Sequence, residues 1–175
     1  MPRFQGRRFA WLLAIAAAAL LAGCDAEEYV TAKIEPTQGN TATGEVRFFK
    51  VETGVRIVAG ISGLTPGKHG FHLHEKGDCS APDAASAGPH WNPSGADHGK
   101  WGEGAFHHGD IGNIEVGKDG KGRTTLTTEL WTLGGPEGTN ILGRSVIVHA
   151  NVDDFKTQPT GNAGGRIGCG VIAAQ

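Results

Sequence analysis

Residues 45–61 read Glu-Val-Arg-Phe-Phe-Lys-Val-Glu-Thr-Gly-Val-Arg-Ile-Val-Ala-Gly-Ile, and this stretch decides the fold class. Two short runs, 45–51 and 54–61, are rich in β-branched and aromatic residues and flank a turn signal at Glu52-Thr53-Gly54. The second run alternates apolar residues with other types, except at Val58. A period of two on either side of a turn predicts a pair of antiparallel strands.

Further short runs of this kind recur along the chain. They lie at residues 113–116, 123–128, 145–149 and 166–172, and Asp119-Gly120 marks a hairpin turn between the first two. Glycine is frequent, at 29 of 175 residues, and no part of the chain beyond its N-terminal segment carries a long 3.6-residue period. We therefore expect one all-β domain, an antiparallel barrel or sandwich without internal repeats.

Residues 77–112 differ from the rest of the chain. They are dense in Gly, Pro, Asp and His and show no strand pattern. A loop of that length is uncommon inside a compact domain unless it has a function. Metal ligands and a disulfide are two ways to hold such a loop in place.

The N-terminus has the composition of an export signal. Arg3, Arg7 and Arg8 precede an apolar run at 9–21, which at 13 residues is too short to span a bilayer. Leu21-Ala22-Gly23-Cys24 follows and resembles a bacterial lipobox, in which cleavage precedes the cysteine and its sulfur is lipid-modified.

We therefore expect three segments. Residues 1–23 are a lipoprotein signal peptide, residues 24–30 are a lipidated Cys24 with a short tether, and residues 31–175 are the folded domain. The expected location is the periplasm, anchored to a membrane of the cell envelope through Cys24. The alternative is an ordinary signal peptide with an incidental cysteine.

The charge pattern gives no sign of a nucleic-acid partner. The chain has 16 basic and 18 acidic residues, and without residues 1–23 the counts become 13 and 18, a net charge of −5 with neutral histidines. No basic run occurs beyond the extreme N-terminus. The sequence leaves open whether the protein is a monomer or a homodimer.

The cysteine count predicts one disulfide. If Cys24 carries lipid, Cys79 and Cys169 remain as a pair in an oxidising compartment. A bridge between them closes a loop of roughly 90 residues and stabilises the fold by roughly 4–5 kcal/mol in the chain-entropy account. The alternative is two free thiols.

Seven side chains of the metal-binding kind fall in one pattern. They are His72, His74, His90, His98, His107, Asp110 and His149. Imidazole suits copper and zinc, and a carboxylate among histidines suits zinc. Seven ligands are too many for one site, so they predict two adjacent metals, most simply with one ligand shared.

Local geometry suggests how these ligands divide. His72 and His74 are two residues apart on an expected strand, so both point to one face, and Leu73 points into the core. His98, His107 and Asp110 lie in the long loop and form a natural zinc set. His90 lies between the groups and is the best bridge, because an imidazolate has a nitrogen for each metal.

At this point the sequence resembles the exported bacterial copper/zinc superoxide dismutases over most of residues 31–175. The motifs that carry the resemblance are Gly70-Phe-His-Leu-His74, Gly88-Pro-His-Trp-Asn-Pro93, His107-His-Gly-Asp-Ile-Gly-Asn113, Gly143-Arg-Ser-Val-Ile-Val-His149 and Gly161-Asn-Ala-Gly-Gly-Arg-Ile-Gly-Cys-Gly-Val171. The resemblance implies an antiparallel Greek-key barrel with long metal-binding loops. It also implies dismutation of superoxide to dioxygen and hydrogen peroxide by alternating Cu(II) and Cu(I), which would protect the cell envelope.

The resemblance also implies a role for each site residue. Copper is then held by His72, His74, His90 and His149, and zinc by His90, His98, His107 and Asp110. Asp153 matches a carboxylate that links a copper ligand to a zinc ligand, with Asp154 as its rival. Arg166 matches an arginine that docks superoxide, and Thr160 matches a threonine of the access channel. His90 and Arg166 are the expected catalytic residues. His108 is the rival of His107, but the three-residue step to Asp110 favours His107.

Two other classes of function stay open on sequence grounds. One is a copper- or zinc-binding protein without turnover, and the other is a structural envelope lipoprotein that binds no metal. A storage protein needs neither a bridging ligand nor an anion-docking arginine. One copper and one zinc per chain would therefore favour the enzyme.

Overall fold

The structure, a computed structural model, describes Met1 and residues 29–174. The predicted signal peptide, the lipidation at Cys24 and the first part of the tether lie outside the described residues. The strands are β1 (Tyr29–Pro36), β2 (Thr43–Val51), β3 (Gly54–Ser62), β4 (Gly67–His74), β5 (Gly112–Val116), β6 (Lys121–Thr128), β7 (Ser145–His149) and β8 (Arg166–Ala173).

The strands close into an eight-stranded antiparallel barrel. Around the barrel they follow the order β1-β2-β3-β6-β5-β4-β7-β8. β3 pairs with β6, and β4 pairs with β7. The β3–β4 and β6–β7 connections therefore join strands that are not neighbours in the barrel, as in a Greek key. The prediction of an all-β antiparallel barrel is confirmed.

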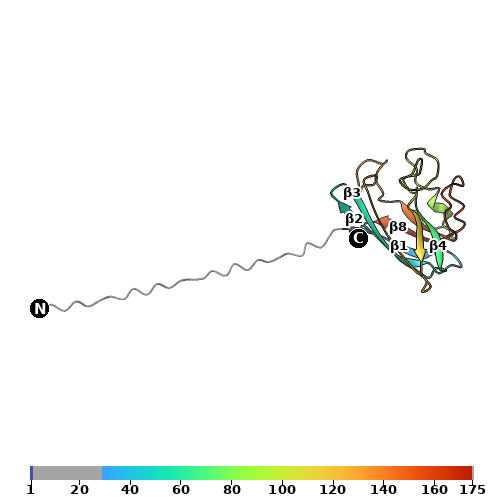
Figure 1. Cartoon of the computed structure of the whole chain (residues 1–175), viewed down its shortest axis with the longest axis horizontal. Coiled ribbons are helices and arrows are strands. Elements are labelled where there is room, and N and C mark those ends of the chain that lie inside the picture. The colour runs from blue at the N-terminus through green and yellow to red at the C-terminus, as the bar shows by residue number, and fades with distance from the viewer. Residues whose placement is uncertain (2–28, 175) are drawn as a thin grey trace.

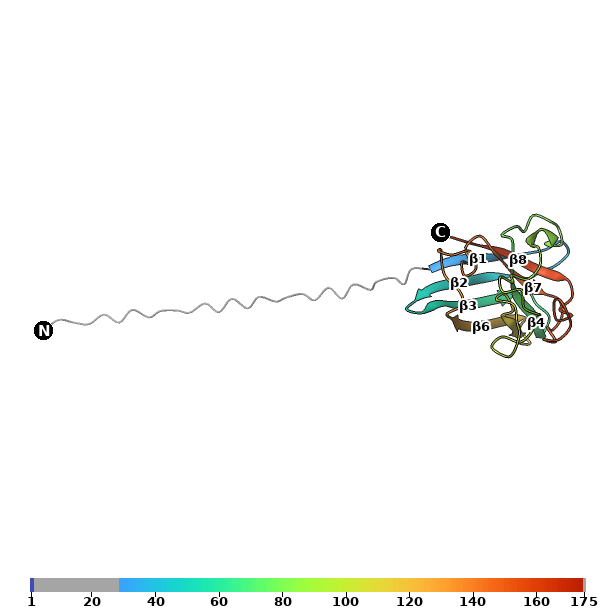
Figure 2. The same cartoon turned by 90° about the horizontal axis from the view of Figure 1, so that it is seen from above.

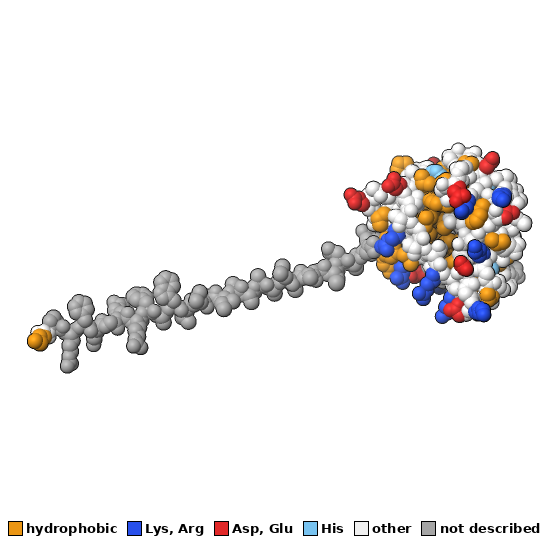
Figure 3. Space-filling view, in the orientation of Figure 1, with side chains coloured by type: hydrophobic (Ala, Val, Ile, Leu, Met, Phe, Trp, Pro, Cys, Tyr) orange, Lys and Arg blue, Asp and Glu red, His pale blue; other side chains and the backbone are white. Residues whose placement is uncertain are grey.

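The hairpin predicted at residues 45–61 is β2 and β3. Their register runs from Thr43 opposite Ser62 to Val51 opposite Gly54. Alternate residues such as Val46, Phe48 and Ile57 are fully buried in the barrel, as a period of two requires. Acidic and basic side chains are interspersed over the outer surface (Figure 3).

β1 is a strand that the sequence patterns did not single out. It begins at Tyr29, inside the range 24–30 assigned to the tether, and pairs with both β2 and β8. Only Ala32 and Ile34 of its residues are fully buried, and the exposed Lys33 separates them. Two small apolar positions give a weak period, and the barrel closes over them because both neighbouring strands supply hydrogen bonds.

β4 and β7 are buried on both faces. Every residue from His69 to His74 and from Ser145 to His149 is buried, because long loops cover the outer side of these strands. In Figure 2 the loops gather at the end of the barrel far from the start of β1, and Figure 1 shows the same separation. The space between barrel wall and loops is where the site lies.

The long loop contains one short element and one covalent anchor. A 3₁₀ turn, η1 (Ala85–Ala87), interrupts it, and Cys79 forms a disulfide with Cys169 of β8, with Cα atoms 5.8 Å apart. The disulfide prediction is confirmed. Among the described residues, no helix is long and apolar enough to cross a membrane.

Candidate metal centre

The structure brings His72, His74, His90 and His149 into one cluster. One nitrogen from each ring lies within 4.8 Å of the others, and all four residues are buried. His72 and His74 extend from the outer face of β4, and His149 ends β7, which pairs with β4. His90 arrives from the long loop through an isolated β-bridge with His74.

Outer hydrogen bonds set which nitrogen of each ring carries the proton. His74 Nδ1 lies 2.9 Å from the Gly88 carbonyl oxygen, and His149 Nδ1 lies 3.3 Å from the Gly164 carbonyl oxygen. His72 Nε2 lies 2.8 Å from Asp153 Oδ2. Because these oxygens only accept, each named nitrogen donates, and the other nitrogen of each neutral ring keeps a free lone pair.

Those free lone pairs are what a metal needs. Four buried nitrogens in this cluster have no hydrogen-bond partner among the described residues: His72 Nδ1, His74 Nε2, His90 Nε2 and His149 Nε2. A buried nitrogen without a hydrogen-bond partner lowers the stability of the fold. A bound metal ion would give all four nitrogens a partner. Four imidazole donors fit copper.

A second cluster is formed by His90, His98, His107 and Asp110. His90 Nδ1 and His107 Nδ1 lie 2.8 and 3.1 Å from Asp110 Oδ1 and 3.5 Å from each other. His98 Nδ1 lies 3.0 Å from Asp110 Oδ2. Ligand atoms around tetrahedral zinc stand roughly 3.3 Å apart, so three imidazoles and one carboxylate at this spacing fit zinc.

His90 belongs to both clusters. Its Nδ1 faces the second cluster, and its Nε2 faces the first. Its ring centroid lies 4.1 Å from that of His72, 5.4 Å from that of His98 and 5.5 Å from that of His107. The ring of His90 therefore lies between the two groups. One side chain can therefore contact two ions at once.

Asp153 ties the two clusters together from outside. Its carboxylate accepts from His72 Nε2 at 2.8 Å and from His98 Nε2 at 3.0 Å, and it is almost fully buried. Asp154, its rival in sequence, is exposed and accepts from Thr157 instead. Asp153 thus orients one ring of each cluster.

Burial keeps the first cluster neutral. It lowers the pKa of His72 despite the nearby Asp153. Burial, together with neighbouring histidines, holds the pKa values of His74 and His149 well below their ordinary value. Burial also lowers the pKa of His90 to about 4, although Asp110 opposes the shift. Neutral rings are the form that binds metal.

The second cluster holds charge instead. Burial disfavours the charged ring of His98, but its hydrogen bonds to Asp110 and Asp153 outweigh burial and raise its pKa to about 9. Burial alone would raise the pKa of Asp110, but bonds from His107, His90 and His98 hold it well below its usual range. Without metal, a proton on His98 partly balances the two carboxylates.

Arg166, at the start of β8, lies beside the first cluster. Its guanidinium donates to the carbonyl oxygens of Ala84 at 2.6 Å and Gly88 at 2.7 Å, and its side chain is half-buried. The Gly88 oxygen also accepts from His74 Nδ1. Arg166 therefore places a fixed positive charge near His74, with donors left over for an anion.

The remaining histidines and Thr160 lie outside both clusters. His69 sits between the carbonyl oxygens of His149 and Thr65, at 2.8 and 2.9 Å. His108 packs edge-on against Trp91 and does not take the place of His107. Thr160 is half-buried, and its carbonyl oxygen accepts from the Ala163 N–H at 3.4 Å.

Sequence reasoning missed two amides that hold the site residues in place. The side chain of Asn113 both accepts from and donates to the backbone of Asp153, at 2.8 and 2.9 Å. Gln158 does the same for the backbone of His98, at 2.9 Å in each direction. Asn113 closes one of the family-like motifs, which was a usable signal, whereas nothing in sequence marks Gln158.

Comparisons with known proteins agree on one family. The family described as "Copper/zinc superoxide dismutase (SODC)" matches residues 42–172. A "Superoxide dismutase [Cu-Zn]" from Onchocerca volvulus is 39% identical over 154 residues, which cover 82% of this chain and 96% of the relative.

Two solved structures are similar along nearly their whole length. The clock protein EA4 is 38% identical with a TM-score of 0.74, and the match covers 85% of this chain and 96% of EA4. A double mutant of a "SOD-like protein" from Bacillus subtilis is 36% identical with a TM-score of 0.74, covering 82% of this chain and 97% of the other.

Proposed function

Because the chain belongs to the copper/zinc superoxide dismutase family, we propose that it converts two superoxide ions and two protons into dioxygen and hydrogen peroxide. Copper would be held by His72, His74, His90 and His149, and zinc by His90, His98, His107 and Asp110. One observation carries this proposal. Four buried ring nitrogens without partners face one another, and His90 reaches from them to a second cluster.

When bound, copper supplies one-electron redox chemistry and zinc supplies a fixed charge without redox chemistry. The protein residues do the rest. The outer bonds from Asp153, Gly88 and Gly164 hold three rings with their lone pairs inward. His90 Nε2 is the atom of the shared ring that faces the first cluster, so it is the place to hold a proton for the departing peroxide.

Arg166 would bind the substrate. Its charge is permanent, and two carbonyl oxygens fix its orientation. A net charge of −5 on the chain after residue 23 repels an anion, so local attraction at the site is needed. Arg166 is therefore assigned to docking, and His90 to proton holding.

Superoxide dismutation by the purified protein, with copper and zinc quantified, tests this function. We expect one copper and one zinc per chain, copper-dependent activity and inhibition by cyanide. His90→Ala should abolish activity, and His108→Gln, outside both clusters, should keep it. Full occupancy of both metals without turnover would instead support a metal-binding protein on the same scaffold.

For location, we propose export and lipid anchoring at Cys24, which would place the activity in the cell envelope. The arginine-led apolar run and the Leu21-Ala22-Gly23-Cys24 motif support this. Cys24→Ser should move the protein from the membrane fraction to the soluble periplasmic fraction. Unchanged membrane fractionation would show that another feature anchors it.

A further inference from the structure

Three ligand-bearing segments meet in a closed triangle of backbone hydrogen bonds. Trp91 N donates to Leu73 O, Leu73 N donates to Gly109 O, and Gly109 N donates to Trp91 O, each at 2.9 Å. Leu73 lies between His72 and His74, Trp91 follows His90, and Gly109 precedes Asp110. The triangle therefore sets the relative positions of both clusters.

Arg144 contacts two residues at or next to this triangle, Trp91 and Glu75. Its guanidinium carbon lies 4.3 Å from the centroid of the Trp91 ring. Its Nη1 donates to the carbonyl oxygen of Glu75, the residue after His74, at 3.0 Å. Its Nε and Nη2 donate to the carbonyl oxygens of Asn140 at 2.8 Å and Glu137 at 3.0 Å.

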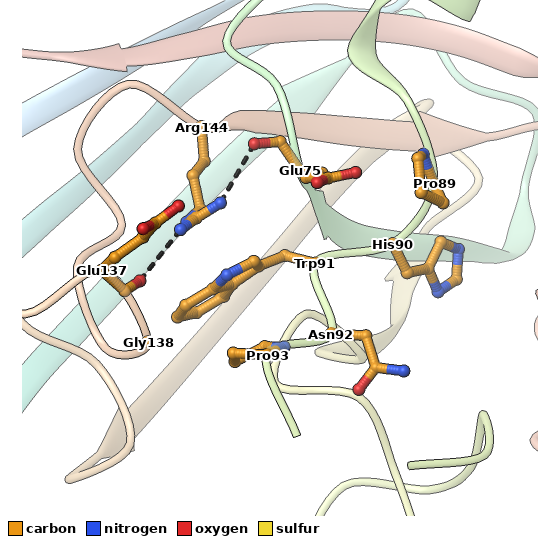
Figure 4. A pocket seen from close by; sticks show the side chains of 9 residues that line it. All are labelled: Glu75, Pro89, His90, Trp91, Asn92, Pro93, Glu137, Gly138 and Arg144. Carbon is orange, nitrogen blue, oxygen red and sulfur yellow. Dashed lines mark hydrogen bonds between the residues drawn. The ribbon is translucent and has the colours of Figure 1, made fainter. Parts of the chain in front are cut away.

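Figure 4 shows this arrangement in the pocket beside the site, a cavity of about 370 Å³. The guanidinium of Arg144 lies between Glu75 and Glu137 and over the indole of Trp91, and the ring of His90 points away from it. Within the part of the chain that the structure describes, the hydrogen bonds and ring contact of Arg144 involve no proposed metal ligand side chain. Arg144 contacts the next residue along the chain from two of them, His74 and His90.

We propose that Arg144 is a positioning residue of the metal centre, which holds His74 and His90 in place through Glu75 and Trp91. The inference rests on the proposed ligand assignment. It goes further by giving a role to a residue outside both clusters. Arg144 also directly precedes β7, which ends at His149, so three of the four histidines of the first cluster depend on segments that it touches.

The contacts require arginine rather than any cation. A planar guanidinium can stack on indole while its edges donate to three carbonyl oxygens in different directions. A lysine keeps the charge near Glu75 and Glu137 but loses the stack and the fork. Arg144→Lys therefore separates positioning from simple charge.

The test measures zinc and copper binding directly rather than activity. The zinc dissociation constant is obtained by competition with a chromophoric chelator, and the Cu(II) electron paramagnetic resonance spectrum is recorded with and without zinc. Loss of a group that hydrogen-bonds directly to a metal ligand typically weakens metal binding by about 10- to 100-fold. Arg144 acts one residue further away, through Glu75 and Trp91, so the effect should fall at the lower end of that range. We expect a roughly tenfold rise in the zinc dissociation constant for both Arg144→Ala and Arg144→Lys, and a smaller zinc-induced change in the copper spectrum.

The chain offers a matched control. Arg56 lies 4.6 Å from the ring centroid of Phe49 on the outside of the barrel, away from both clusters. Arg56→Ala removes a comparable stack, and should leave zinc affinity and the copper spectrum unchanged. Trp91→Phe, which keeps a smaller ring under the guanidinium, is a second probe if Arg144→Ala folds poorly.

The outcomes separate the two proposals. Wild-type protein that binds neither metal would overturn the proposed function itself. Wild-type protein that binds both metals, with Arg144 variants that bind them equally well, would overturn the positioning role and leave the function standing. A wild-type zinc affinity and copper spectrum in Arg144→Lys, but not in Arg144→Ala, would show that a positive charge suffices. That result would also overturn the positioning role of the guanidinium.

Discussion

The two halves of the barrel are built on different principles. β2 and β3 bury apolar side chains such as Val46, Phe48 and Ile57 in the core, and residues between them are exposed or half-buried. β1 and β6, on either side of this pair, follow the same inward and outward alternation with fewer buried apolar side chains. In β4 and β7 both faces are buried, and the outer face of β4 carries His72 and His74 under loops. The first group of strands has one buried face, which packs in the apolar core. β4 and β7 lie between that core and the polar side chains of the two metal-ligand clusters.

This difference separates the residues that stabilise the barrel from the residues of the proposed metal centre. The four-strand half gains its stability from buried apolar area, so a small substitution there lowers the free energy of unfolding in proportion to the apolar area lost. The ligand half buries polar groups that hold one another through directed hydrogen bonds, such as those that Asp153 accepts from the rings of His72 and His98. Loss of one such bond leaves a buried partner unsatisfied.

Removal of the disulfide should have the largest effect. Cys79→Ser combined with Cys169→Ser opens a link between residues 90 positions apart, and should lower the free energy of unfolding by about 4–5 kcal/mol. Denaturant unfolding under oxidising conditions measures it. Because the bridge anchors the long loop, amide exchange should rise in residues 79–90 more than in β2 and β3. Uniform exchange across both halves would contradict the contrast.

Zinc affinity should rise about tenfold from pH 7 to 8 and about fivefold from pH 8 to 9, roughly 50-fold in all, since one bound proton must leave. The pKa of His98 is raised to about 9, so without metal its ring is mostly protonated at pH 7 and 8 and half protonated at pH 9, and it must be neutral to bind zinc. Above that pKa the rise should level off. Copper affinity is the control. The pKa values of His74 and His149 are held well below neutral, so it should stay flat. A flat zinc profile measured by titration at pH 7, 8 and 9 would refute the assignment.

Adding one methyl group at a glycine should have different effects in the two halves, and Gly109→Ala tests the ligand half. A Cβ at Gly109 would overlap the carbonyl oxygen of Leu73, so we expect a loss of about 1–3 kcal/mol and weaker zinc binding. Gly60, on the exposed side of β3, has nothing within 4 Å of an added Cβ. Gly60→Ala should be neutral or stabilise by up to about 1 kcal/mol. Thermal and denaturant melts of both variants decide the matter, and equal effects would remove the distinction.

The smallest effect is expected inside the four-strand core. Ile57 is fully buried, and Ile57→Val removes one methylene at a cost of about 0.5–1.5 kcal/mol. Metal stoichiometry and zinc affinity should not change, because Ile57 packs in the apolar core and is not a proposed metal ligand. A shift in zinc affinity with this variant would show that the two halves are coupled through the core.

The sequence predicts the barrel and the two clusters of the site for a clear reason. Strand periodicity is local, and the seven metal-binding side chains are of types that have few other uses when they recur in one pattern. β1 is missed because Ala32 and Ile34 give too short an alternation. Arg144 is missed because its partners are carbonyl oxygens, which every residue carries. Only the folded chain shows that residues 75, 137 and 140 present theirs to one guanidinium.

The carbonyl oxygen of Gly88 has a consequence for how such a site can change over evolutionary time. It accepts from His74 Nδ1 and from Arg166 Nη2, and it lies two residues before His90. A shift of this one peptide group would move the hydrogen-bond partner of His74 and Arg166 and the approach of His90 together. Under the proposed roles, a change at Gly88 would therefore affect anion docking and metal binding together.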